Sequence, residues 1–317
     1  MNAGDPENSS LGTEHPGEAL EPRPLVRRGW LRALLFLVIY AVCALGLMVV
    51  VGVGFAVWMQ LTDGEMPSAE AFTNVSRLGL GVLALTQLLT LALTVAVVAA
   101  MRRLVDRRSV TSLGLELRGH GPDLVQGMLW GAGLIVFGFV GLLATGSLQL
   151  DPGHASIGLS TFVGYLAVLV VVAVNEELMI RGYLLSNLMD SMNRWVALFV
   201  SALVFATLHL LNANVTPMGI VNLVLAGIVL GVYYVHRGNL WFGIGMHLTW
   251  NLFQGPVFGF EVSGLQTPSL VGHTVRGPAL LTGGEFGLEG SILTTIFLLA
   301  AAVVIHLQWR TRAHPPD

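Results

Sequence analysis

The segment Asn175-Glu-Glu-Leu-Met-Ile-Arg181 places two carboxylates and a guanidinium inside an otherwise apolar stretch. It is preceded by Val168-Leu-Val-Val-Val-Ala-Val174 and followed by Gly182-Tyr-Leu-Leu185. A charged side chain in hydrocarbon costs at least about 2.5 kcal/mol, so such residues are rare in membrane spans and mark functional sites. We therefore expect Glu176 and Glu177 to have partners elsewhere in the fold.

The composition is that of a membrane protein. The chain has 317 residues, of which 54% are hydrophobic and 11% charged, and its mean hydropathy is +0.73. Soluble domains carry about 25% charged residues. All 16 basic residues are arginine and they form no dense patch, which gives nucleic-acid binding little support. Cys43 is the only cysteine, so a disulfide within one chain is excluded.

Apolar runs predict an all-α polytopic membrane protein with about eight transmembrane helices. A helix needs about 17–25 apolar residues to cross the hydrocarbon core, and most of the runs approach or exceed this length. The first is too long for a signal-peptide core, so we expect an uncleaved membrane helix there. The runs are Ala33–Met59, Leu78–Met101, Leu124–Gly146, Ile157–Met189, Trp195–Leu211, Met218–Val235, Leu240–Phe258 and Ser291–Gln308.

The sequence divides into a tail and one membrane domain. Residues 1–29 begin with a stretch rich in Pro, Gly, Glu and Ser that shows no apolar period, which predicts a disordered cytoplasmic tail. Residues 30–317 form the predicted multi-span domain. Its longest external connection, residues 259–290, is rich in glycine and is either a flexible link or a partly ordered lid. Gly227 and Gly231 form a small-xxx-small pattern suited to close helix packing.

Arginines predict the orientation of the chain. Nearly all basic loop residues lie on one side of the predicted spans, and the opposite loops are mainly acidic with only Arg77 and Arg276 as basic members. The positive-inside rule makes the arginine-rich side cytoplasmic, so both termini are expected in the cytoplasm. The arginines on that side are Arg27, Arg28, Arg32, Arg102, Arg103, Arg107, Arg108, Arg118, Arg194, Arg237, Arg310 and Arg312.

The paired glutamates are expected to have different roles. Glu177 and Arg181 are four residues apart, so they can form an ion pair on one helix face. Glu176 points about 100° away from Glu177 and is free to face a cavity or another partner. The simpler alternative is a buried ion-pair clasp without catalysis, which leaves Glu176 unexplained.

Three further polar residues lie at a depth similar to that of Glu176. With a rise of 1.5 Å per residue, Glu176 is about 21 Å from Asp190 at the cytoplasmic end, and His209 is about 22 Å from the equivalent marker of its own span. His247 and Asn251, which are four residues apart on one helix face, are about 15 and 21 Å from Arg237 at the cytoplasmic end of their span. We expect these groups to converge, although each taken alone can be a packing residue that forms a hydrogen bond between helices.

A carboxylate, two imidazoles and an amide at one depth suit hydrolysis. A glutamate in an apolar pocket can take a proton from water, and imidazole or amide N–H groups can stabilise a tetrahedral oxyanion. Alternatively, His209, His247 and Glu176 could hold Zn²⁺ or another divalent metal with one position open for water. The chain has no His-Glu-x-x-His helix, so the common zinc-protease motif is absent.

These residues resemble a known family. Glu176-Glu-x-x-x-Arg181, Phe205-x-x-x-His209 and His247-x-x-x-Asn251, in this order on successive membrane helices, look like the CPBP intramembrane proteases. That family includes the CAAX prenyl endopeptidases and the bacterial Abi proteins linked to bacteriocin processing or immunity. The resemblance covers about residues 124–307. It implies a protein of the bacterial inner membrane that cleaves a peptide or protein substrate.

The resemblance also implies roles for the residues. Glu176 would be the general base, and Glu177 with Arg181 would hold the helix. His209 would help to activate the water or bind a metal, while His247 and Asn251 would shape the oxyanion site. The CAAX substrate is not implied, because no residue here recognises a prenyl group. Two alternatives remain, a non-enzymatic immunity or scaffold protein and a proton-coupled transporter that uses Glu176 and the histidines as a relay.

Overall fold

The computed structural model describes residues 23–62, 79–151, 153 and 157–310, and this part of the chain is almost entirely helical. Residues 1–22 of the predicted disordered tail lie outside the described residues. The α-helices are α1 (Gly29–Thr62), α3 (Gly79–Ala100), α4 (Gly121–Ala144), α5 (Leu159–Glu177), α6 (Ser186–Met189), α7 (Arg194–Leu208), α8 (Pro217–Arg237), α9 (Trp241–Leu252), α10 (Ala279–Thr282) and α11 (Ile292–Trp309).

All eight apolar runs are helical, but they differ in their ability to cross a membrane. Six helices of the described chain are long and apolar enough to do so: Gly29–Leu61, Gly79–Val105, Gly121–Ala144, Leu159–Met189, Pro217–Arg237 and Ile292–Trp309. The other two, α7 with 15 residues and α9 with 12, are shorter. The all-α membrane fold is thus confirmed, and the expected eight crossings become six full-length helices with two short ones between them.

Wider helical turns interrupt or extend several of these helices. Leu178–Leu185 is a π-helix between α5 and α6, Met101–Val105 is a π-helix after α3, and Phe253–Val257 is a π-helix after α9. π-helical turns are rare in proteins, and those that occur often lie at functional sites. The first of them follows Glu177 directly, and all eight of its residues are buried.

The helices begin and end at residues that satisfy their free backbone groups. Asn193, Thr216 and Ser291 are N-caps whose side chains accept hydrogen bonds from backbone N–H groups in the first turns of α7, α8 and α11. Gly238 ends α8 with a φ of +66°, a left-handed conformation that favours glycine. The turn at Gly238 keeps the connection from α8 to α9 short.

Glycines let the helices around the site approach very closely. A Cβ added at Gly127 or Gly131 of α4, or at Gly245 of α9, would collide with backbone atoms of the facing helix. A Cβ added at Gly227 of α8 would lie 2.8 Å from the Cα atom of Ala202 in α7. The close approach of α8 to Ala202 at Gly227 agrees with the small-xxx-small pattern of α8. The same packing between α4 and α9 fixes the helix that carries His247.

The arginine-rich segments meet at one end of the bundle. Arg32 at the start of α1 and Arg108 after α3 both contact Asp190 after α6, with N–O distances of 2.5 and 3.0 Å. Arg102 pairs at 3.0 Å with the fully buried Asp106. We call this end, with α6 and the last turns of α8 and α11, the arginine end.

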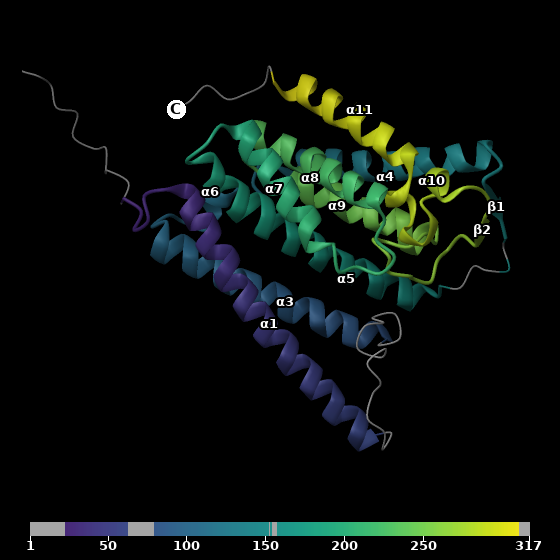
Figure 1. Cartoon of the computed structure of the whole chain (residues 1–317), viewed down its shortest axis with the longest axis horizontal. Helices are drawn as coiled ribbons and strands as arrows, with labels where there is room; N and C mark the ends of the chain where they lie inside the picture. The colour runs from purple at the N-terminus through teal and green to yellow at the C-terminus, as the bar shows by residue number, and fades with distance from the viewer. Residues whose placement is uncertain (1–22, 63–78, 152, 154–156, 311–317) are drawn as a thin grey trace, which may run out of the picture.

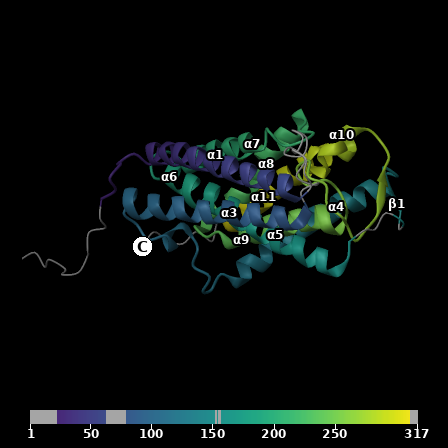
Figure 2. The ribbon, with the colours of Figure 1, turned by 90° about the horizontal axis from the view of Figure 1, so that it is seen from below.

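Opposite the arginine end lie the long connection after α9 and a two-stranded sheet. Strand β1 (Leu148–Leu150) pairs antiparallel with β2 (His273–Val275). Figures 1 and 2 both place α6 and α10 at opposite ends of the molecule, and Figure 1 shows α1 diverging from the helices of the main body along its length. Residues 259–290, expected to be a link or a lid, are an ordered connection with β2, α10 and two 3-10 turns, Gly284–Phe286 and Leu288–Gly290.

Candidate active site

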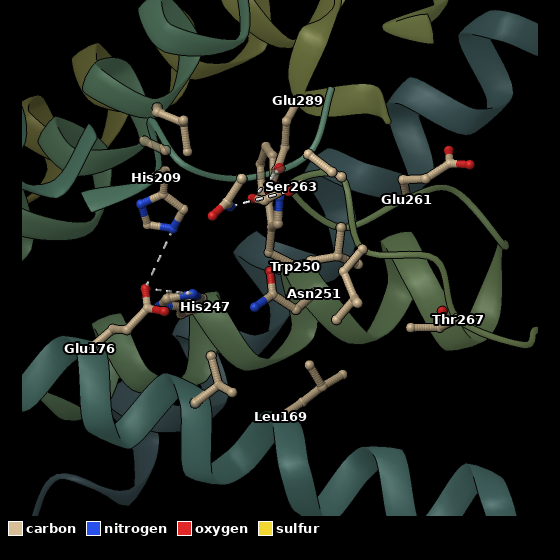
Figure 3. Close-up of a pocket in the computed structure, with 18 of the residues that line it drawn as sticks. Leu169, Glu176, His209, His247, Trp250, Asn251, Glu261, Ser263, Thr267 and Glu289 are labelled. Atoms are coloured by element: carbon tan, nitrogen blue, oxygen red, sulfur yellow. Dashed lines mark hydrogen bonds and ion pairs between the residues drawn. The ribbon is translucent and has the colours of Figure 1, made fainter. Parts of the chain in front are cut away.

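A cavity of about 910 Å³ opens between the helices and the long connection after α9. Side chains from α3, α5, α7, α8, α9 and α11 line it, together with residues 211–214 and 261–267 of the connections opposite the arginine end. Four of the residues singled out in the sequence, Glu176, His209, His247 and Asn251, line this one cavity (Figure 3).

Glu176 lies at the centre of the predicted group. Its Oε2 atom is 3.9 Å from Nε2 of His209 and 3.8 Å from Nε2 of His247. Oε2 is buried and makes no hydrogen bond with the described residues, although the side chain as a whole is 23% exposed. These separations are longer than hydrogen bonds, so the three groups face one shared space.

The other ring nitrogen of each histidine is occupied. Nδ1 of His209 is 2.8 Å from the carbonyl oxygen of Phe205, and Nδ1 of His247 is 3.0 Å from Oε1 of Glu177. A carbonyl or carboxylate oxygen only accepts, so Nδ1 donates in both rings. Both imidazoles therefore turn Nε2 towards Glu176.

Glu177 is fully buried, and together with Arg181 it connects α5, α8 and α9. Its Oε1 atom accepts hydrogen bonds from Nη1 of Arg181 at 2.8 Å and from His247 at 3.0 Å. Nη2 of Arg181 donates to the carbonyl oxygen of Gly227 in α8, and the guanidinium lies 4.7 Å from the centre of the Phe205 ring. The predicted Glu177–Arg181 pair is present, and it also orients His247, which the sequence did not indicate.

Asn251 follows His247 by one helical turn and lines the cavity. Its side chain has no hydrogen-bond partner among the described residues, although the residue is only 6% exposed. A buried amide without a partner loses free energy unless water or a ligand satisfies it. The amide is thus available to a molecule that enters the cavity.

Glu289 is a cavity residue that sequence analysis missed. Its carboxylate accepts hydrogen bonds from Nε1 of Trp250 at 3.1 Å and from Oγ of Ser263 at 2.6 Å. It thereby joins the connection after α9 to the residue that precedes Asn251. Burial raises the pKa of Glu289 above its ordinary value, with the two hydrogen bonds opposing this shift. An acidic residue in the apolar turn Leu288–Gly290 was the available signal.

Glu176, His209 and His247 are the residues expected to hold a metal, and the structure gives the distances between them. No group of three or more His, Cys, Asp or Glu side chains in this part of the chain is close enough to hold a metal ion. Ligand atoms at about 2.0–2.2 Å from one tetrahedral ion lie about 3.3–3.6 Å apart. The separations of 3.8 and 3.9 Å between Glu176 and the histidines exceed this range. The residues expected to hold a metal thus border one space, and a metal site there stays a prediction.

Gly243 of α9 provides a test of this arrangement. A Cβ atom there would lie 2.8 Å from Oε2 of Glu177, whose position is fixed by Arg181 and His247. We expect Gly243→Ala to lower the free energy of unfolding by about 1–3 kcal/mol, because overpacking displaces the carboxylate. Gly133→Ala in α4 is the control, since a Cβ there meets nothing within 4 Å. Thermal unfolding in detergent measures both, and equal stability of the two variants would contradict the prediction.

Comparison with known families supports the resemblance of the motifs. Residues 158–253 match the family model of the Rce1-like proteins, described as type II CAAX prenyl endopeptidase Rce1-like. The matched range contains Glu176, His209, His247 and Asn251. No curated protein and no solved structure matches the chain in the corresponding searches. Residues 158–253 are therefore similar to the Rce1-like type II CAAX prenyl endopeptidases, which supports the resemblance to the CPBP and CAAX proteases.

Proposed function

We propose that the chain is an intramembrane endopeptidase in which Glu176 activates the water that attacks the peptide bond. The observation that carries the proposal is the space shared by Glu176, His209 and His247 at the wall of a large cavity. A carboxylate with no hydrogen bond there is free to accept a proton from water. The two imidazoles border the same space and can orient that water.

The remaining groups suit the later steps. Attack of water on the carbonyl carbon gives a tetrahedral intermediate with a negative oxygen. Nδ2 of Asn251, together with Nε2 of a protonated His247, would donate hydrogen bonds to that oxygen. Glu176 would then transfer the proton it accepted to the leaving amine, so that the bond breaks into a carboxylic acid and an amine. Glu177 and Arg181 act as positioning residues because they hold His247 and do not reach the cavity wall.

Charge asymmetry supports a location for this activity. We propose that both termini lie in the cytoplasm and that the membrane is the inner membrane of a bacterium. The arginine end gathers Arg32, Arg102 and Arg108, and basic residues accumulate on the cytoplasmic side of membrane proteins. The resemblance to the bacterial members of the family supports the membrane named.

A cleavage assay with the purified protein tests the function and its metal requirement together. The full chain in detergent is incubated with quenched fluorescent peptides, with and without a chelator such as 1,10-phenanthroline. We expect cleavage that changes by less than about twofold on chelation, since water activation by Glu176 needs no Lewis acid. Loss of cleavage that Zn²⁺ restores would favour the metal-dependent alternative. Absence of cleavage with every peptide would favour a non-enzymatic binding protein.

A further inference from the structure

The end of the bundle at which the cavity opens and the charge of its lining residues both indicate the kind of substrate it takes. Its outer wall is formed by residues 211–214 and 261–267, which are connections between helix ends opposite the arginine end. At about 910 Å³, it is near the upper limit of about 1,000 Å³ for small-molecule sites. It is thus large enough for several residues of an extended peptide.

The charged side chains of the cavity lining are mainly carboxylates. Glu176, Glu261, Glu285 and Glu289 line it, and none of the lining residues is an arginine. Glu285 is exposed and Glu261 is half-buried, and neither forms an ion pair within the described residues. Burial raises the pKa of Glu261, and the nearby carboxylate of Glu285 adds to this shift. Both carboxylates line the same cavity, so both can contact a cation that enters it.

A second observation points to a ligand in the same cavity. Asn251 presents an amide without a partner from a residue that is 6% exposed, and it lies between Glu176 and Glu261 in the view of Figure 3. A peptide backbone offers both the acceptor and the donor that such an amide lacks. Glu261 and Glu285, which we call the acidic wall, would then contact the residues of the peptide on either side of the peptide bond that Asn251 contacts.

We propose that the cavity takes a positively charged polypeptide segment presented on the extracytoplasmic side of the membrane. The side follows from the arginine end, because the cavity opens at the opposite end of the bundle. The charge follows from Glu261 and Glu285, which attract Lys or Arg residues and repel a free carboxylate. The proposal rests on the endopeptidase function and narrows it to exported proteins or external loops with basic segments.

Thiol labelling tests the side. In a Cys43→Ser background, which removes the only cysteine, Leu211→Cys and Leu117→Cys each provide one reactive group. Leu211 is 97% exposed at the cavity wall, and Leu117 is 55% exposed between α3 and α4. A membrane-impermeant maleimide should label Leu211→Cys in intact cells and Leu117→Cys only after permeabilisation. The reverse pattern would overturn the assigned side.

Peptide binding tests the charge independently of catalysis. Three fluorescent peptides share one apolar core and carry flanking Arg, Gln or Glu residues, and their binding to the full chain with Glu176→Gln is followed by fluorescence anisotropy. We expect the Arg peptide to bind about tenfold more tightly than the Glu peptide, a ratio that one well-placed charge contact supplies. Adding Glu261→Gln and Glu285→Gln should reduce this ratio to less than about threefold, whereas Glu116→Gln, on the exposed segment before α4, should not.

Two results would overturn the charge preference. They are equal binding of the Arg and Glu peptides, and a ratio that Glu261→Gln and Glu285→Gln leave unchanged. Tight binding of the Arg peptide without its cleavage by the unsubstituted protein would instead reject the endopeptidase function while supporting the recognition. Failure of the function and failure of the substrate class are therefore separate outcomes.

Discussion

Replacing Glu176 by Gln is expected to reduce peptide cleavage by about 10²–10⁴-fold, the usual contribution of a general base. The amide keeps the size of the side chain and cannot accept the proton of the attacking water. Stability should change by less than about 0.5 kcal/mol, because Oε2 makes no hydrogen bond that the substitution would remove. Cleavage is measured with the purified variant, and folding by thermal unfolding and size-exclusion chromatography in detergent.

Glu116→Gln is the matched control for this prediction. Glu116 lies on the exposed segment before α4, at the arginine end and away from the cavity, so the same chemical change should leave cleavage unaffected. If Glu176→Gln cleaved peptides at the rate of the control, Glu176 would not be the base. A cellular function that persists without cleavage would then favour the immunity or scaffold alternative.

Replacing Glu177 by Ala is expected to lower the free energy of unfolding by about 3–5 kcal/mol. The substitution leaves the guanidinium of Arg181 charged, 1% exposed and without the carboxylate that accepts its hydrogen bond. Desolvation of an unpaired charge is the largest penalty available at this position. Thermal unfolding of the variant should show a marked decrease in Tm, and the expression level in membranes should fall with it.

A double-mutant cycle separates the pair from its surroundings. Replacing both members by apolar residues, as Glu177→Leu with Arg181→Met, removes the charge and its partner together. The double variant should be more stable than Glu177→Leu alone, since apolar replacement of a buried ion pair is often neutral. Strict additivity of the two single effects would show that Glu177 and Arg181 do not stabilise each other. His247 loses its acceptor in either case, so cleavage should remain low.

Taken together, the adjacent glutamates are expected to differ in kind. Replacing Glu176 should lower the rate of peptide cleavage with little effect on stability, and replacing Glu177 should mainly lower the free energy of unfolding. The physical cause is the difference in environment, because Glu176 is 23% exposed in the cavity and Glu177 is fully enclosed with two donors.

Much of the site was predictable because its signals are local or one-dimensional. The four-residue spacing of Glu177 and Arg181 predicts their pairing from helix geometry alone. Rise per residue placed Glu176, His209 and Asn251 at similar depth, and the structure has them around one cavity. The apolar runs likewise predicted the helices, since a membrane helix needs a continuous stretch of apolar residues.

Other features depend on contacts that spacing does not encode. The hydrogen bond from His247 to Glu177 joins residues 70 positions apart, and that from Trp250 to Glu289 joins residues 39 apart. Both depend on how α5, α9 and the long connection pack. The ordered form of residues 259–290 also follows from its pairing with β1 and α9 and was left open by its glycine content.

By itself, the sequence determined that this chain folds as helices in a membrane and that Glu176, His209, His247 and Asn251 lie at comparable depth. Both conclusions follow from the sequence because the hydrophobicity of each residue decides whether it can lie in the membrane. The charged residues mark the ends of each helix, and the rise per residue then gives the depth of the polar residues. Only the tertiary structure decided that α7 and α9 are short, that Glu177 holds His247, and that the cavity opens opposite the arginine end with an acidic wall. These depend on the packing of whole helices, made close by glycines such as Gly131 and Gly245, and packing is a property of pairs of distant residues.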